Sequence, residues 1–359
     1  MSGDRPHGLV AHVTGTRIGL VALLLLSIAT PSFAQPARSG AGLGQDSVVM
    51  DDRTEQTIRA ALKYLSSKRN GNGSWATGEG DRQELAMTGY VIMAFLAAGQ
   101  LPDEGEFGKD VTAGMNFLLN TVRPDGTMQP NGHYMYGHGI ASIALAELYG
   151  QTKDPRIRPK LELVIRLIIN SQNQKGGWRY QPRIGDDDIS VTVLQVVALR
   201  AAKNAGIDVP QATIDRAVRY VRTCYHQRSG GFTYQPRGGD PGFARTAAAI
   251  YSLQVCGEYD HPWVKKGSEY LFKKKEDRQW FSYGHFYAAP AQYMVGGDTW
   301  RKYYTEIKDL LLKNLSTKGD LYFWEPRLDQ GRPVGQVYCT AVYAKILAVP
   351  YHYLPLYQR

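Results

Sequence analysis

The sequence predicts an all-α fold, an α/α toroid of about six helix hairpins, and three observations lead to it. First, one pattern recurs six times: an aliphatic residue, a polar residue, usually a glycine, and a large side chain, most fully at Gln172, Gly176 and Trp178. Second, the copies stand about 40 to 54 residues apart, which is typical of stacked two-helix units. Third, the helix predicted after each copy is more apolar than the one before it. Such hairpins bury every apolar face by closing into a ring, although an open solenoid has the same local pattern.

The first 34 residues are predicted to be a signal peptide. Arg5 and Arg17 precede an apolar run, residues 18–29, that is too short to span a bilayer, and small residues follow it up to Ala34. Residues 35–50 are rich in glycine, serine and alanine and are interpreted as a flexible leader. Residues 51–359 then form a single toroid domain. We expect an exported protein, periplasmic or secreted, without a transmembrane segment after cleavage; an uncleaved anchor is the alternative.

The repeat also defines the helices on either side of it. Outer helices are predicted at residues such as 56–67, 159–173 and 211–225, which are charged and place apolar residues three and four positions apart. Inner helices are predicted where alanine and other small residues are frequent. Their ranges are 84–98, 137–149, 188–203, 242–256, 283–295 and 335–348.

The large side chain of each repeat has two interpretations. An exposed row of aromatic rings would bind sugars, whereas the repeat pattern favours wedges between adjacent hairpins. We predict wedges. The side chains concerned are Trp75, Trp178, Phe232 and Tyr322.

Composition narrows the range of partners. The chain has 42 Lys and Arg against 33 Asp and Glu, a formal net charge of +9. This modest excess is spread over predicted outer helices, so it indicates a solvated face with some attraction to anionic envelope polymers. Nucleic acid is not an expected partner, because the chain is predicted to be exported and its sequence shows no nucleic-acid recognition motif.

The turn at Gln172, Gly176 and Trp178, with Ile168 four residues before Gln172, resembles the QW repeat of the terpenoid cyclase and protein prenyltransferase superfamily. The likeness covers about residues 54–357 and implies an α/α toroid. Three segments look like exported bacterial proteins with prenyltransferase/squalene oxidase repeats or a squalene cyclase C-terminal domain. The resemblance to that subgroup implies a fold but no particular activity. The segments are 188–192, 242–246 and 353–359.

The superfamily's catalytic motifs are incomplete here. Its squalene–hopene type cyclases protonate an alkene with an Asp-x-Asp-Asp motif, and the similar string at 185–188 has Gly185 in place of the first acid. Its protein prenyltransferases hold zinc with Asp, Cys and His, and Cys256, Cys339 and His285 lack the matching context. The resemblance therefore implies neither a metal nor a cofactor.

Parallel inner helices would bring their N-termini to one end of the toroid, and polar side chains gather there. Asp187 and Asp188 are the tentative catalytic residues, and Arg245 could pair with either one. Each residue also has a structural interpretation: the acids as helix caps, the histidines as satisfied core residues, and the arginine pair as a structural ion pair. The ligand-binding candidates are Glu84, His138, Arg245, His285 and Tyr338.

Three functions are compatible with these residues. The one favoured is a non-catalytic exported protein that binds an apolar small molecule, or an envelope protein or glycan, at the central cavity or its mouth. The second is an isoprenoid cyclase, terpenoid or squalene type, with Asp187 or Asp188 as proton donor. The third is a glycan-active α/α toroid that uses two carboxylates such as Glu84 and Asp188.

Overall fold

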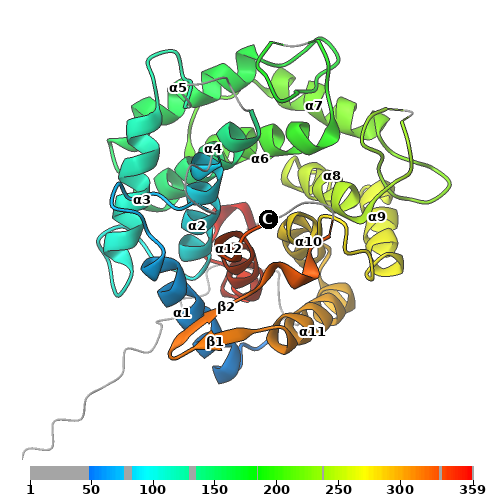
Figure 1. Ribbon diagram of the computed structural model, residues 1–359. Coiled ribbons are helices and arrows are strands. Elements are labelled where there is room, and N and C mark those ends of the chain that lie inside the picture. Colours follow the sequence, from blue (N-terminus) through cyan, green and yellow to red (C-terminus); the bar gives the residue numbers. More distant parts are fainter. Residues whose placement is uncertain are drawn as a thin grey trace, which may run out of the picture. The chain divides into compact units, whose positions relative to one another are not determined.

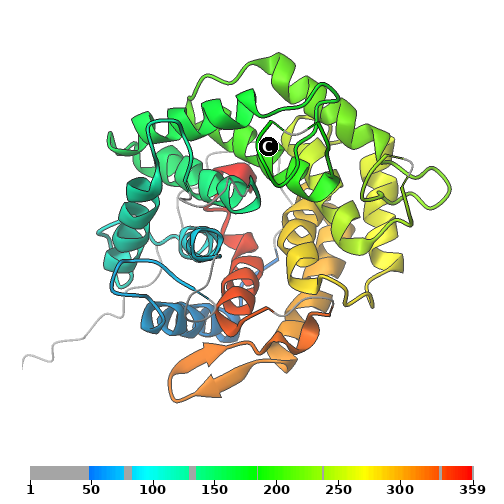
Figure 2. The same ribbon diagram turned by 45° about the horizontal axis from the view of Figure 1, so that its top comes forward.

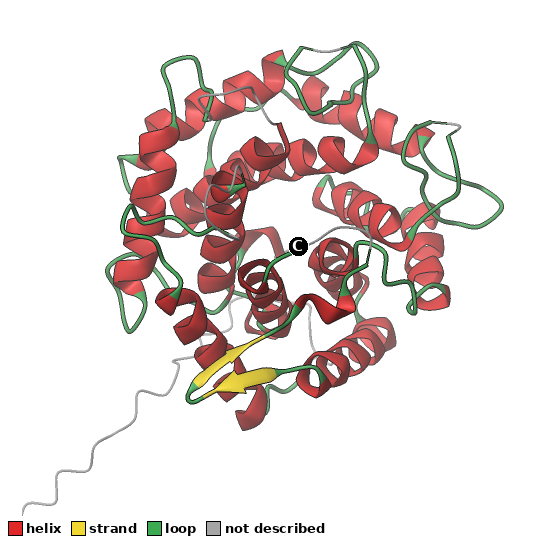
Figure 3. Cartoon of the chain, viewed as in Figure 1, coloured by secondary structure: helices red, strands yellow, loops and turns green. Residues whose placement is uncertain are grey.

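The computed structural model describes residues 48–76, 83–128, 135–183, 185–236, 238–330 and 334–357. Gly40–Arg359 forms one compact unit. The predicted signal peptide, residues 1–34, and most of the predicted leader lie outside the described residues. Within the unit the described residues form α-helices and one small antiparallel hairpin, β1 (Ser316–Lys318) and β2 (Leu321–Phe323) (Figure 3).

The helices form two concentric layers (Figure 1). Burial separates the layers: 13 of the 14 residues of α2 are buried, against six of the 13 in the amphipathic helix α7. The outer helices are α1 (Asp52–Ser67), α3 (Gly108–Thr121), α5 (Ile157–Asn170), α7 (Gln211–Thr223), α9 (Pro262–Lys273) and α11 (Gly297–Lys313). The inner helices are α2 (Glu84–Ala97), α4 (Met135–Thr152), α6 (Ile189–Ala205), α8 (Phe243–Val255), α10 (Phe281–Val295) and α12 (Gln336–Leu347).

The inner helices close into a ring (Figure 2). Each inner helix contacts the next, from α2 through α4, α6, α8 and α10 to α12, and α12 returns to contact α2. The last helix also packs against the first outer helix, α1. The predicted α/α toroid of six hairpins is therefore confirmed, and the open solenoid is excluded.

The third repeat shows how each turn is fixed. The indole nitrogen of Trp178 donates to the backbone oxygen of Ile168 on α5 at 2.8 Å, and its backbone nitrogen donates to Oγ1 of Thr192 on α6 at 3.0 Å. Gly176 has φ of +95°, and a Cβ there would lie 2.3 Å from the backbone oxygen of Arg216 on α7. Only glycine tolerates both conditions. The turn thus joins its own two helices to the next outer helix.

The sixth wedge differs from the prediction. Tyr322 is only half-buried, because it lies in β2, and the fully buried wedge is Trp324. The indole nitrogen of Trp324 donates to the oxygen of Leu311 at 2.8 Å, and its backbone nitrogen donates to Oγ1 of Thr340 at 3.2 Å. The prediction of Tyr322 was wrong because the hairpin lengthens this turn. The other predicted wedges are fully buried: Trp75, Trp178 and Phe232.

The chain ends across one end of the ring. After α12 come two short 3₁₀ turns, η2 (Val349–Tyr351) and η3 (Pro355–Tyr357), and η3 contacts α4, α6 and α10. Leu354, Leu356 and Tyr357 are buried there. We call residues 349–357 the tail and the end of the ring that it covers the tail end. No described helix is long and apolar enough to cross a membrane.

Candidate functional site

Backbone and side-chain hydrogen bonds bring the N-termini of the inner helices to one end of the ring, which we call the mouth. The backbone nitrogen of Met135, which begins α4, donates to the oxygen of Tyr180 at 2.8 Å. The backbone nitrogen of Ile189, which begins α6, donates to the oxygen of Tyr234 at 3.0 Å. Loops that precede the next inner helix therefore satisfy amide groups that a helix leaves open at its start.

Asp188 caps α6 and is fully buried at the mouth. One oxygen, Oδ1, accepts the backbone N–H of Val191 at 2.9 Å, and the other, Oδ2, accepts Nη1 of Arg179 at 2.7 Å. Burial raises the pKa of Asp188, while the Val191 amide and Arg179 oppose that shift. Its structural interpretation as a helix cap is confirmed, and the ion pair adds a second partner.

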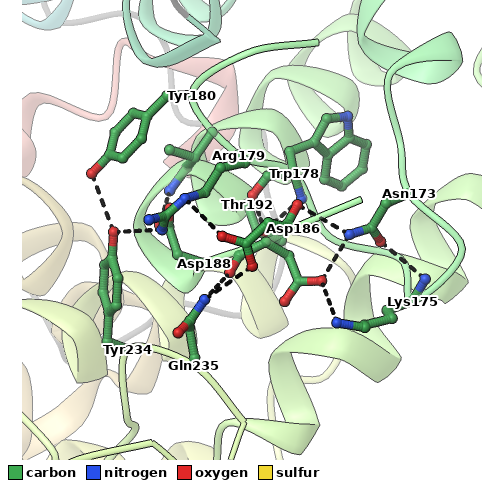
Figure 4. A network of polar contacts seen from close by, with 12 residues as sticks. Asn173, Lys175, Trp178, Arg179, Tyr180, Asp186, Asp188, Thr192, Tyr234 and Gln235 are labelled. Carbon is green, nitrogen blue, oxygen red and sulfur yellow. Dashed lines mark hydrogen bonds and ion pairs between the residues drawn. The ribbon is translucent and has the colours of Figure 1, made fainter. Parts of the chain in front are cut away.

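Of the two preceding aspartates, Asp187 has other partners, whereas Asp186 lies beside Arg179 (Figure 4). Asp187 is buried, accepts Nδ2 of Asn173 at 2.7 Å and lies 3.5 Å from Nζ of Lys175. Asp186 remains 53% exposed and lies 3.3 Å from Nε of Arg179. Asp186 and Asp188 thus share one guanidinium, and Asp186 is the carboxylate that solvent reaches most easily.

The guanidinium of Arg179 lies between two tyrosine rings. Its central carbon is 5.0 Å from the ring centre of Tyr180 and 5.6 Å from that of Tyr234, both half-buried. Nη1 donates to the hydroxyl of Tyr234 at 2.9 Å, and the two tyrosine hydroxyls are 3.2 Å apart. We call Arg179, Tyr180, Asp186, Asp188 and Tyr234 the arginine cluster.

Three members of the arginine cluster were not predicted from the sequence, Arg179, Tyr180 and Tyr234, although a signal was present. The string Tyr-Gln-Pro-Arg occurs twice, at 180–183 and 234–237, each time two residues after a wedge. Gln235, from the second string, donates to the backbone oxygen of Asp187 at 2.7 Å. A repeat of polar and aromatic residues at matching positions in adjacent hairpins indicates a shared site.

Tyrosine rings meet at the centre of the ring just below the mouth. Tyr136 of α4 and Tyr283 of α10 belong to opposite inner helices, and their ring centres are 6.3 Å apart. The hydroxyls of Tyr136 and Tyr90 are 2.8 Å apart, and Tyr338 packs edge-on against Tyr90 at 4.9 Å. The predicted ligand residue Tyr338 therefore lies in this buried group, which we call the tyrosine floor.

The two histidines turn away from the mouth. Nε2 of His138 is 3.0 Å from the backbone oxygen of Gly126, in the turn after the outer helix α3. Nδ1 of His285 is 2.8 Å from the hydroxyl of Tyr303 on the outer helix α11. Burial lowers the pKa of His285 to about 3, so this ring stays neutral at physiological pH. Both positions match the structural interpretation of buried, bonded histidines.

Glu84 and Arg245 also lie apart from the arginine cluster. Glu84 begins α2 and accepts hydrogen bonds from Asn72 and Ser74 of its own turn. Arg245 is half-buried on α8 and makes no ion pair with a described residue. The expected pairing of Arg245 with Asp187 or Asp188 was wrong, because Arg179 follows the wedge directly and reaches Asp188 first.

The residues that the structure describes contain no group of three or more His, Cys, Asp or Glu side chains placed to hold a metal ion. The arginine cluster offers carboxylates, a guanidinium and tyrosine hydroxyls.

The chain belongs to the prenyltransferase alpha-alpha toroid domain family, which matches residues 43–138 and 140–284. A relative, drimenyl diphosphate synthase of Streptomyces showdoensis, is 27% identical over 194 residues, which are 53% of this chain and 34% of the relative. The chain thus spans about a third of the length of that enzyme.

Several solved structures share the fold. An inactive variant of an α-1,6-mannanase of Salegentibacter, with two consecutive aspartates replaced and α-1,6-mannotriose present, has a TM-score of 0.65 at 6% identity, covering 84% of this chain and 99% of that one. Cellobiose 2-epimerase of Spirochaeta thermophila has a TM-score of 0.61 at 14% identity, covering 84% and 97%. The type II terpene cyclase MstE of Scytonema has a TM-score of 0.56 at 13% identity, covering 84% and 99%. At these identities the likeness shows the fold alone.

Proposed function

We propose that this protein binds an oligosaccharide at the mouth of its toroid, over the arginine cluster. The observation that carries the proposal is the combination of two half-buried tyrosine rings with the exposed carboxylate of Asp186 and the guanidinium of Arg179. Sugars present apolar ring faces and many hydroxyls, so aromatic faces beside charged hydrogen-bonding groups suit them. A mostly polar mouth suits an isoprenoid chain less well.

The structural neighbours support this class of ligand. The mannanase and the epimerase are named for sugars, and the mannanase structure was solved with a mannotriose. Its inactive form lacks two consecutive aspartates, and this chain places three consecutive aspartates at its mouth. Because the sequences have diverged, this parallel supports the proposal without assigning a reaction.

Turnover of a bound sugar has less support than binding. Glycan hydrolysis uses two carboxylates on either side of the bond to be broken, one of them with a raised pKa. Asp186 and Asp188 are bound to one guanidinium, and burial raises the pKa of Asp188. The sequence analysis paired Glu84 with Asp188, but Glu84 begins α2 and Asp188 caps α6. Because α4 lies between α2 and α6 in the ring, these two acids are not on neighbouring inner helices. Because Asp188 is fully buried with both oxygens bonded, and Asp186 converges on the same guanidinium, we assign no catalytic pair and limit the proposal to binding.

The test is titration calorimetry of the full chain with α-1,6-mannotriose, cellobiose and a wider set of oligosaccharides, followed by product analysis. We expect Arg179→Gln and Asp186→Asn to weaken binding at least about tenfold. Asp320→Asn is the matched control, because this exposed aspartate pairs with Lys63 on the outer layer. Wild-type protein that binds no oligosaccharide, or an Arg179→Gln variant that binds like wild type, would overturn the proposal.

A second candidate is an isoprenoid cyclase, which the family and the similarity to drimenyl diphosphate synthase favour. Asp187 and Asp188, either of which the incomplete motif offers as proton donor, are both buried. Asp187, however, accepts Nδ2 of Asn173 at 2.7 Å and lies 3.5 Å from Nζ of Lys175, so described residues already bind its carboxylate. Incubation with linear isoprenoid diphosphates tests this candidate, and only a cyclic product that Asp187→Asn abolishes would favour it.

The binding of an apolar ligand or an envelope protein, favoured by the sequence, stays a prediction, as does export to the periplasm or beyond. An apolar ligand has less support than a sugar, because the tyrosine floor occupies the centre below the mouth. Fractionation of cells that express the full chain, with detection in the envelope or medium, tests export.

A further inference from the structure

We propose that Trp280 is a second aromatic platform of the mouth, on which a further sugar ring of the bound oligosaccharide stacks. The inference rests on the proposed function and extends it from one group of contacts to a chain of several sugar units.

Trp280 is exceptional among the described tryptophans. It is 40% exposed, and the only other large apolar side chain exposed in the described residues is Val49, next to the start of the first described range. Trp263 on α9 is half-buried and stacks on Tyr225 at 4.6 Å. An exposed indole can stack on a sugar ring, which a buried one cannot do. A single exposed apolar side chain is common on protein surfaces, so it is the position of Trp280 that favours a ligand contact. The remaining described tryptophans are fully buried: Trp75, Trp178, Trp300 and Trp324.

The backbone of Trp280 is held in an unfavourable conformation. Its φ of +59° and ψ of +39° are left-handed, which costs about 1–2 kcal/mol for a residue with a side chain. Two hydrogen bonds maintain it: the backbone nitrogen of Trp280 donates to the oxygen of Gln330 at 2.9 Å, and the nitrogen of Gln330 donates to the oxygen of Arg278 at 2.8 Å. Glycine or asparagine would fit this conformation better, so the fold itself does not require an indole here.

The position of Trp280 joins it to the arginine cluster. Trp280 immediately precedes α10, and the hydroxyl of Tyr283, in the first turn of that helix, donates to the oxygen of Ser190 at 3.3 Å. Ser190 lies in the first turn of α6, two residues after Asp188. Trp280 and the arginine cluster therefore lie at the starts of two inner helices, α10 and α6, at the same mouth. A ligand that touches both must contain several sugar rings.

The experiment compares Trp280→Ala, Trp280→Phe and the control Trp263→Ala in the full chain, by calorimetry with oligosaccharides of increasing length. We expect Trp280→Ala to weaken binding of the longer oligosaccharides about tenfold and to leave the shortest bound ligand unchanged. Trp280→Phe keeps an aromatic face and should stay within about threefold of wild type. Trp263→Ala should bind like wild type at every length.

The outcomes separate the two proposals. If Arg179→Gln weakens binding and Trp280→Ala does not at any length, Trp280 is no platform and the proposed function stands. Wild-type protein that binds no oligosaccharide overturns both. Thermal unfolding of each variant is the folding control, and Trp280→Ala should melt within a few degrees of wild type because little contact is lost.

Discussion

The mouth and the tail end of this toroid differ in whether their buried ionisable side chains form ion pairs. At the mouth, Asp188 and Arg179 form an ion pair at 2.7 Å, and Arg179 reaches solvent. At the tail end, Glu147 of α4 and Lys345 of α12 are both buried and form no ion pair with each other. Nζ of Lys345 instead donates to the oxygen of Phe286 at 3.2 Å and lies 3.7 Å from the centre of its ring.

The pKa values follow from this difference. Burial raises the pKa of Glu147 to about 8, against a smaller opposing effect of the Leu356 amide and of Lys345. Burial lowers the pKa of Lys345 to about 7, with Glu147 opposing. The tail end therefore favours neutral forms, whereas the mouth keeps paired charges beside water. The polar ligand that we propose would find its partners at the mouth, whereas the tail end contributes to stability.

Removal of the tail is expected to have the largest effect. Deletion of residues 349–359 exposes the surfaces covered by Leu354, Leu356 and Tyr357, each worth about 1.5–3 kcal/mol when fully buried. The loss of about 5 kcal/mol or more would leave the protein unfolded or close to it, as seen by circular dichroism and urea denaturation. Leu354→Ala is the milder version, expected to cost about 2–4 kcal/mol. A deletion variant as stable as the full chain would show that the tail end needs no cover.

The turns at the mouth should be nearly as sensitive, at the wedge that the structure identifies. Trp324→Ala removes a fully buried indole and should cost about 3–5 kcal/mol in urea denaturation. Tyr322→Ala, two residues earlier on the half-buried strand, should cost less than about 1 kcal/mol. A larger loss of stability for Tyr322→Ala than for Trp324→Ala would identify Tyr322 as the sixth wedge after all.

Lys345→Met tests the neutral tail end directly. The pKa of Lys345 is 10.5 in the unfolded chain and about 7 in the folded protein. Between these two pH values the unfolded chain binds more protons than the folded one, so the wild type becomes less stable as the pH is lowered from about 10.5 to about 7. Below about pH 7 this cost stays constant. Methionine removes this cost, about 5 kcal/mol for the fall from 10.5 to about 7, but loses the Phe286 contacts, worth about 3 kcal/mol. The variant should therefore be about 2 kcal/mol more stable than wild type at pH 6 and less stable than wild type near pH 10.5.

Thermal unfolding of Lys345→Met at pH 6 and at pH 10 measures this difference. Lys318→Met, an exposed lysine on β1, is the control and should show no such pH dependence. A variant less stable than wild type at both pH values would mean that the charged lysine stabilises the tail end.

The smallest effect is expected from single acids at the mouth. Asp188→Asn keeps a capping oxygen for the Val191 amide but loses the charge that pairs with Arg179, at a cost of about 1–2 kcal/mol. Asp186→Asn, half-exposed, should change stability by less than about 0.5 kcal/mol. Equal costs for the two variants would contradict the difference in burial between these neighbours.

Much of the site could not be predicted, because its partners are distant in the sequence. Asp187 and Asp188 were found as acids at the start of an inner helix, which is a local signal. The cations that pair with them, Arg179 and Lys175, were not found, because their positions depend on how a loop folds. Tyr180 and Tyr234, whose hydroxyls meet, are 54 residues apart. Asp187 and Asp188 as catalytic residues, and Glu84, His138, Arg245, His285 and Tyr338 as ligand residues, stay predictions.

The sequence by itself determined the hairpins, their number and their two layers, because helix periodicity and the wedge motif are local and recur six times. It also determined that Trp75, Trp178 and Phe232 are buried, since each repeat imposes the same turn. Only the tertiary structure decided that the ring closes, that a strand hairpin moves the sixth wedge to Trp324, and that the tail covers one end. It also decided which charges are paired at the mouth and which are neutralised at the tail end. These features depend on contacts between segments far apart in the chain, and no local pattern encodes them.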